Sequence, residues 1–200
     1  MRIRFQWLLL TLPILAVTVT AEDAAKPAAP MPELVEVEID DIKLSVPKAW
    51  RQEQPSNKLR LAQFAIREAE GDKEASEFVV SPPIGGTREA NVARWIDQFE
   101  KDGREVVMTT GKCAQGEYLY VELSGTYKRP IGPPFARKVE PVKDYRMHGM
   151  ILSASKDGKP LGNFYLKLVG PKNTIKANGD SVRASVGADK ATEEKFELSN

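Results

Sequence analysis

The clearest hydrophobic pattern in the chain predicts a helix over residues 87–103. Four apolar residues recur there at the i, i+3, i+4 and i+7 spacing of one helix face: Val92, Trp95, Ile96 and Phe99. Thr87 or Asn91 can cap the first turn, and Gly103 stands where a left-handed residue closes a helix. An apolar stripe of this kind needs a sheet to pack on.

Alternating apolar and polar residues predict the strands of that sheet. The pattern occurs in residues 42–46, 59–66, 78–81, 105–110, 118–127, 145–155 and 163–168. In 118–127 it predicts one buried face and one solvated face, which is typical of an antiparallel sheet. In 145–155 apolar side chains lie on both faces, so this strand is predicted to be central and covered on both sides.

The remaining segments set the predicted boundaries. Apolar residues at helical spacing predict a last helix over 172–186, with Gly187 as its stop. Residues 189–200 are polar and are predicted to fray as a tail, and the Ala- and Pro-rich residues 22–36 are predicted to form an extended linker. Residues 37–188 then form one α+β domain, an antiparallel sheet of about six to seven strands flanked by helices in an α/β/α sandwich.

The N-terminus has the features of a secretory signal peptide over residues 1–21. Arg2 and Arg4 precede an uncharged run that ends in small residues at Ala21. We therefore expect a secreted or periplasmic protein, without stable membrane insertion after cleavage. The alternative is an uncleaved N-terminal anchor, which needs about 20 apolar residues to cross a bilayer.

The charge balance argues against nucleic acid as a partner. The chain has 29 basic and 28 acidic residues, and removing residues 1–21 takes away two arginines and no acid, which leaves 27 against 28. Binding dominated by phosphate neutralisation would need a strongly basic domain.

Cys113 and His148 are the candidates for reactive chemistry. Cys113 is the single cysteine, so it is either a reactive or bridging thiol or a small buried residue, and no intramolecular disulfide can form. His148 is the single histidine, which leaves no cluster of histidines for a metal. A Cys113–His148 dyad is conceivable only through the fold. The sequence predicts no catalytic residue, no cofactor and no metal.

Gly85 and Gly86 lie just ahead of the predicted helix over 87–103. Free backbone N–H groups at a helix N-terminus can form an anion-binding nest, although the spacing matches no nucleotide-binding fingerprint. The alternative is a tight turn that requires positive φ.

Residues 128–144, KRPIGPPFARKVEPVKD, contain four prolines and five basic residues around one phenylalanine. We interpret this segment as an exposed contact loop outside the core, because long irregular loops in compact domains are usually functional or mobile. Its predicted partner-binding residues are Arg129, Phe135, Arg137 and Lys138. The alternative is a solvated connection between two hairpin strands.

Several segments of residues 37–186 resemble the PsbP-like superfamily, which includes an extrinsic subunit of the oxygen-evolving complex and a Ran-binding accessory protein. The resemblance is carried by IKLSVPKAW, RLAQFAI, ANVARWIDQF, YRMHGMILSAS and GNFYLKLVGP. It implies an antiparallel sheet sandwiched by helices, and binding rather than catalysis. The metal- and GTPase-binding residues of particular members have no match here.

Two functions follow as hypotheses. The first is an exported, non-enzymatic binding or accessory domain with an unknown protein partner in the cell envelope, which it contacts through residues 128–144. The alternative is a small-molecule-binding protein or an enzyme with a site near Gly85, Cys113 or His148. Fold alone does not decide function, so a concave polar pocket is the feature that would separate them.

Overall fold

The computed structural model describes residues 32–132 and 137–198. The predicted signal peptide and most of the predicted linker lie outside the described residues. Within the described residues, no helix is long and apolar enough to span a membrane.

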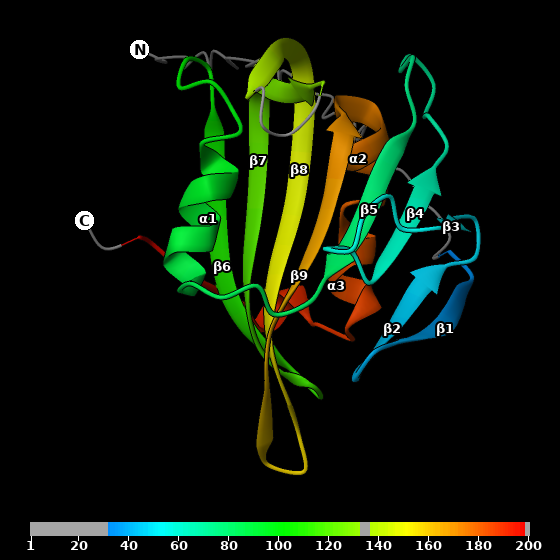
Figure 1. Ribbon diagram of the computed structural model, residues 1–200, viewed down its shortest axis with the longest axis vertical. Helices are drawn as coiled ribbons and strands as arrows, with labels where there is room; N and C mark the ends of the chain where they lie inside the picture. Colours follow the sequence, from blue (N-terminus) through cyan, green and yellow to red (C-terminus); the bar gives the residue numbers. More distant parts are fainter. Residues whose placement is uncertain (1–31, 133–136, 199–200) are drawn as a thin grey trace, which may run out of the picture. The chain divides into compact units, whose positions relative to one another are not determined.

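An eight-stranded sheet forms the centre of the fold, in the order β10-β6-β7-β8-β9-β5-β4-β3 (Figure 1). All neighbouring strands pair antiparallel. The strands are β3 (Arg51–Glu53), β4 (Ala62–Ile66), β5 (Ser76–Ser81), β6 (Glu105–Cys113), β7 (Gly116–Ile131), β8 (Lys138–Lys156), β9 (Lys159–Pro171) and β10 (Glu194–Lys195). A separate hairpin consists of β1 (Leu34–Ile39) and β2 (Ile42–Pro47). The α+β class is confirmed, but the sheet has more strands than predicted, and β1 begins inside the predicted linker.

Both faces of the sheet are covered. One face packs against α1 (Arg88–Ile96), and the other packs against α2 (Lys172–Asn178), α3 (Asp180–Ser185) and the β1–β2 hairpin. In Figure 1, α1 lies on the near side of β6 and β7, and α2 and α3 lie on the far side of the sheet. The two hydrophobic clusters therefore lie on opposite sides of the same strands.

The central strands alternate between these two clusters. Met147 and Ile151 of β8 face α1, whereas Met150 faces α2 and α3, so the prediction of a strand covered on both sides is confirmed. The prediction of a solvated face for 118–127 is wrong, because Tyr118 and Tyr120 are fully buried. Tyrosine was interpreted as polar there, but its ring packs in a core when its hydroxyl finds a partner.

The helix α1 starts where predicted and ends earlier. Thr87 caps it, since its Oγ1 accepts a hydrogen bond from the backbone N–H of Ala90 at 3.1 Å. It ends at Ile96 instead of continuing to Gly103, because the following backbone pairs with β7. Phe99 forms an isolated bridge with Tyr127 there.

The C-terminal region is more ordered than its polarity predicts. The predicted helix over 172–186 is divided at Gly179, whose Cα lies so close to β8 that an added Cβ would be 2.4 Å from the His148 ring. The predicted frayed tail is instead a 3-10 turn (Lys190–Thr192) followed by β10, and Phe196 packs beside the α1-side cluster.

Residues 126–131 of β7 and 138–144 of β8 form a two-stranded ribbon that we call the distal arm. A shift in register between Gly125 and Tyr127 separates it from the rest of the hairpin, and pairing continues to Ile131 and Lys138. The prediction of an irregular loop is therefore wrong for most of residues 128–144, and the contact role stays a prediction. Prolines are tolerated because both strands of a ribbon are edge strands, and an N–H group on the outer side has no ladder partner to lose.

Candidate functional site

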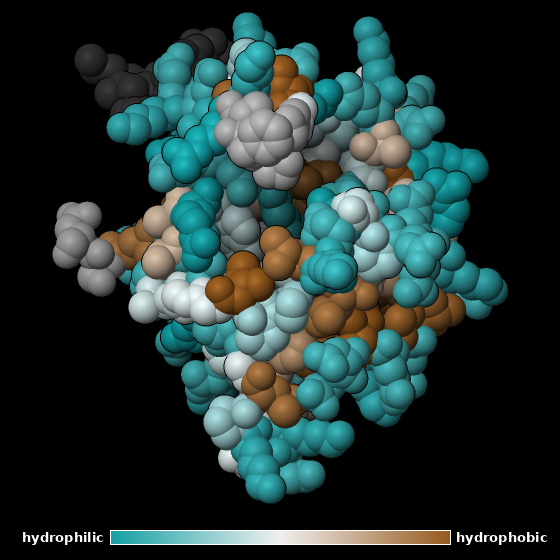
Figure 2. All heavy atoms as spheres, viewed as in Figure 1, coloured by the Kyte–Doolittle hydropathy of each residue, from teal (hydrophilic) through white to brown (hydrophobic). Residues whose placement is uncertain are grey.

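A cavity of about 530 Å³ lies on the α1 side of the sheet, between α1, β5, β9 and the distal arm. Figure 2, in the same view as Figure 1, shows this face hollowed beside α1. Three residues from each strand form its floor: Glu77, Val79 and Ser81 of β5, and Tyr165, Lys167 and Val169 of β9. The hollow exists because α1 is short and packs over the strands around β7, which leaves this side of β5 and β9 without a covering helix.

Lys167 is a lysine of the cavity floor that has no ion-pair partner among the described residues and has a lowered pKa. It lies opposite Val79 in the β5–β9 register, and its Nζ donates a hydrogen bond to Oε1 of Gln98 at 2.5 Å. The same Nζ is 5.6 Å from the centre of the Tyr127 ring. None of the ion pairs in the described part of the chain includes Lys167. Burial lowers the pKa of this amine to about 8, and the Glu77 charge opposes that shift.

The two arginines that line the cavity are already paired. Arg60 Nη1 lies 2.6 Å from Oε2 of Glu77. Arg129 Nη2 lies 2.5 Å from Oε2 of Glu74, and the Tyr145 hydroxyl donates to the same oxygen at 2.6 Å. The hydrogen bonds from Tyr145 and Arg129 hold the pKa of Glu74 below its usual value. Lys167 is thus the cation of this lining that has no carboxylate partner among the described residues.

Aromatic side chains form the walls. Trp95 of α1 meets Tyr165 of β9 edge to face, with ring centres 6.2 Å apart. Asn91 fixes the Tyr165 hydroxyl by donating to it from Nδ2 at 3.0 Å. Trp95 can pack closely on the sheet because Gly149 of β8 is beneath it, where a Cβ would come within 2.6 Å of the ring. The walls are therefore held in place without a ligand.

The predicted candidates Gly85, Cys113 and His148 do not come together. Cys113 packs beside the cluster on the α2–α3 side and pairs with Gly116 at the end of β6. Gly116 in turn pairs with Ala154, which is separated from His148 by about 20 Å of β8 at the usual rise per residue. The geometry excludes a Cys113–His148 dyad.

The contacts of His148 and Gly85 are those of residues that support the fold. The Tyr120 hydroxyl lies 2.6 Å from Nδ1 of His148, and burial lowers the pKa of the imidazole to about 4. Gly85 has a φ of 74°, as the tight-turn alternative requires, and its carbonyl accepts a hydrogen bond from Asn91 Nδ2 at 3.2 Å.

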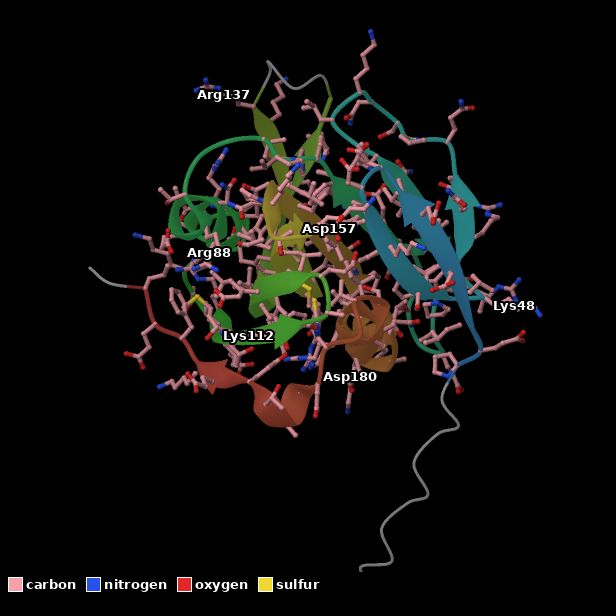
Figure 3. All side chains as sticks on the ribbon, turned by 90° about the horizontal axis from the view of Figure 1, so that it is seen from below. Lys48, Arg88, Lys112, Arg137, Asp157 and Asp180 are labelled. Atoms are coloured by element: carbon pink, nitrogen blue, oxygen red, sulfur yellow. The ribbon has the colours of Figure 1, made fainter. Side chains whose placement is uncertain are left out.

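Of the four predicted partner-binding residues, the three that the structure describes differ from one another in exposure and in contacts. Arg129 pairs with Glu74 and so joins the distal arm to the segment before β5, and its role in partner binding stays a prediction. Arg137 and Lys138 are exposed, and Figure 3 shows Arg137 projecting outward at the end of the arm. Phe135 lies outside the described residues.

A second hollow, of about 680 Å³, lies at the β6 edge of the sheet. Arg88 and Lys112 both line it (Figure 3). Lys112 is paired with Glu117 at 3.0 Å, and both side chains are mostly exposed to solvent. We therefore take the Lys167 cavity as the candidate site.

Sequence reasoning missed this cavity because its residues come from distant segments. The alternation in residues 163–168 predicts Lys167 on the polar face of a strand, and the periodicity of residues 87–103 predicts Gln98 on the polar face of a helix. One signal was available in the sequence. Lys167 stands between Leu166 and Leu168, and the strand predicted over residues 145–155 is apolar on both faces. A lysine in such surroundings indicates a cation beside a core.

A comparison of the sequence with protein-family models finds no match, and a comparison with curated proteins also finds none. Among residues 32–132 and 137–198, no group of three or more His, Cys, Asp or Glu side chains could hold a metal ion.

Proposed function

We propose that this protein is an exported binding domain that holds a small amphipathic molecule in the Lys167 cavity. The observation that carries the proposal is the cavity itself. Its volume of about 530 Å³ lies within the range typical of ligand sites, and it combines aromatic walls with a few convergent polar groups.

The distal arm and the aromatic walls that bound the cavity are preorganised. Glu74 and Tyr145 hold the distal arm through Arg129, and Asn91 holds Tyr165. Binding to such a site needs little ordering of side chains, which favours affinity.

The surroundings of Lys167 favour binding over chemistry. Its hydrogen-bond partner is the side-chain amide of Gln98, which is neither protonated nor deprotonated at ordinary pH.

Native mass spectrometry of the mature protein, purified from its exporting host, tests the proposal. We expect a bound small molecule in addition to the protein mass. Ser81→Phe should abolish it by filling the cavity, whereas Ser155→Phe, at an exposed position of β8, should retain it. Equal ligand occupancy in the two variants would contradict the assignment of the cavity.

A protein partner that docks on the distal arm is the second candidate. The arm exposes Ile131 and Val139, with exposed fractions of 41% and 50%, beside the basic Lys138. Exposed apolar residues within a basic surface favour an interface with an acidic partner. Affinity capture from the cell envelope should recover such a partner with the native chain and not with Val139→Glu.

Export and the PsbP-like resemblance are parts of this proposal and are supported by the sequence features described above. Mass spectrometry of the native protein should find a mature N-terminus near Glu22. An N-terminus at Met1 would support the uncleaved anchor instead.

A further inference from the structure

We infer that the Lys167 cavity selects molecules that carry a carboxylate on an apolar, ring-sized body, with the Lys167 ammonium as the counter-ion of that carboxylate. This inference rests on the proposed function and adds the chemical class of the ligand.

The charges of the cavity lining leave one position for an anion. Glu77 forms an ion pair with Arg60, and Arg129 forms an ion pair with Glu74. Lys167 contributes the remaining positive charge. A neutral ligand would leave that charge as it is, whereas a carboxylate would pair with it.

The immediate neighbours of Lys167 solvate its ammonium incompletely. They include the amide oxygen of Gln98, the face of the Tyr127 ring, and Val79, which lies opposite Lys167 in the β5–β9 register. An ammonium has three donor hydrogens, and the structure gives Lys167 one hydrogen-bond acceptor within the described residues. A carboxylate placed in the cavity could accept from the donors that remain.

Burial, more than the charged groups that face Lys167, accounts for its pKa of about 8. Glu77 of β5 opposes the effect of burial, and the positive charge of Arg60 adds to it by disfavouring a second cation nearby. A bound carboxylate raises the pKa of Lys167, because an opposite charge nearby favours the protonated form. The affinity for a carboxylate should therefore fall as pH rises above about 8, by up to tenfold per pH unit until the pKa of the bound state is reached.

The rest of the cavity fits an apolar body. Trp95, Tyr127 and Tyr165 offer ring faces and edges, and Leu59 and Ile84 are exposed apolar residues of its lining. Aromatic ligands can stack on such walls while their polar group reaches the floor.

The experiment compares 2-naphthoate with its uncharged amide, 2-naphthamide, by titration calorimetry. These probes share one ring system and differ in charge. The ligand-free native chain should bind naphthoate at least tenfold more tightly than naphthamide at pH 7. Lys167→Met should remove that preference by weakening naphthoate at least tenfold while changing naphthamide about twofold or less.

Lys58→Met is the matched control, because Lys58 is an exposed lysine next to Leu59 of the cavity lining. It should leave both affinities and their pH dependence unchanged. Circular dichroism and thermal melting establish that each variant is folded, and Lys167→Arg should restore part of the preference if charge is the cause.

Equal binding of naphthoate and naphthamide by the native chain would overturn this inference and leave the proposed function intact. A preference that survives in Lys167→Met would also overturn it. The proposed function fails separately, if the native protein carries no small molecule and neither probe binds.

Discussion

The guanidinium of Arg183 lies over the ring of Tyr120, with its Cζ 3.6 Å from the ring centre. This contact joins α3 to the middle of the sheet. The same guanidinium lies 2.7 Å from Glu193 and 2.9 Å from Glu122, so it also joins the C-terminal segment to β7. Burial alone would raise the pKa of Glu193, but hydrogen bonds from Arg183 and Thr109 hold it below its usual value.

Arg183→Met should lower the free energy of unfolding by about 3 to 5 kcal/mol, because it leaves a buried carboxylate without its partner. The side chains of Arg183 and Glu193 are only 5% and 3% exposed. Urea titration measures the effect. Lys190→Met, which removes an exposed ion pair with Asp180, should cost less than about 1 kcal/mol. Similar losses in the two variants would mean that Arg183 does not hold the C-terminal segment.

His148 should make stability depend on pH in the acid range. Its pKa is lowered to about 4 in the folded protein from an ordinary value of 6.5, because burial disfavours the imidazolium. The unfolded chain then binds the proton more readily between these two values. Stability is complete above pH 6.5 and declines as pH falls towards 4, by roughly 3 kcal/mol.

Urea titrations at pH 7, 5.5 and 4 measure this decline, and His148→Gln isolates it. The glutamine variant should lose less stability than the native chain over the same range, since it has no imidazole to protonate. Carboxylate titration affects both proteins, so the difference between them is the quantity of interest. Parallel curves would show that His148 is not the group responsible.

Trp95→Ala should cost about 3 to 5 kcal/mol, as is usual for the truncation of a buried aromatic residue. Trp95 is buried between α1 and the backbone of β8 at Gly149. Arg94→Ala is the control on the exposed side of the same helix, where the loss should be small. Equal losses in a denaturant titration would contradict the orientation of α1.

The periodicity of single segments predicted much of this fold. Thr87 was one of two predicted caps because its chemistry acts within one turn, and the alternation of β8 predicted that both of its faces are covered. The end of α1 was not predictable in the same way. Phe99 has the spacing of the helix, but it pairs with Tyr127, which is distant in the sequence.

The candidate site was less predictable than the fold because it depends on pairing between distant polar residues. Arg129 looks like a free contact residue in a basic, proline-rich segment, whereas in the structure it meets Glu74. Glu193 looks like part of a polar tail, and it is buried because Arg183 lies beside it. No local pattern indicates such partners, because a charged side chain can be stabilised either by water or by an ion-pair partner.

The distal arm is expected to be held by Glu74 with little effect on global stability. Glu74→Gln keeps the size of the side chain and removes the charge that Arg129 and the Tyr145 hydroxyl share. The pair is partly exposed, with side-chain exposures of 30% and 50%, so the free energy of unfolding should fall by less than about 1 kcal/mol. Amide hydrogen exchange should nevertheless speed up in residues 126–131 and 138–144, because local opening of an arm depends on its own few ties. Exchange in β6 should remain unchanged, and it serves as the internal control.

If exchange in the arm is as slow as in the native chain, then the stacked rings of Tyr127 and Tyr145, 5.5 Å apart, hold the arm, and Tyr127→Leu should loosen it instead.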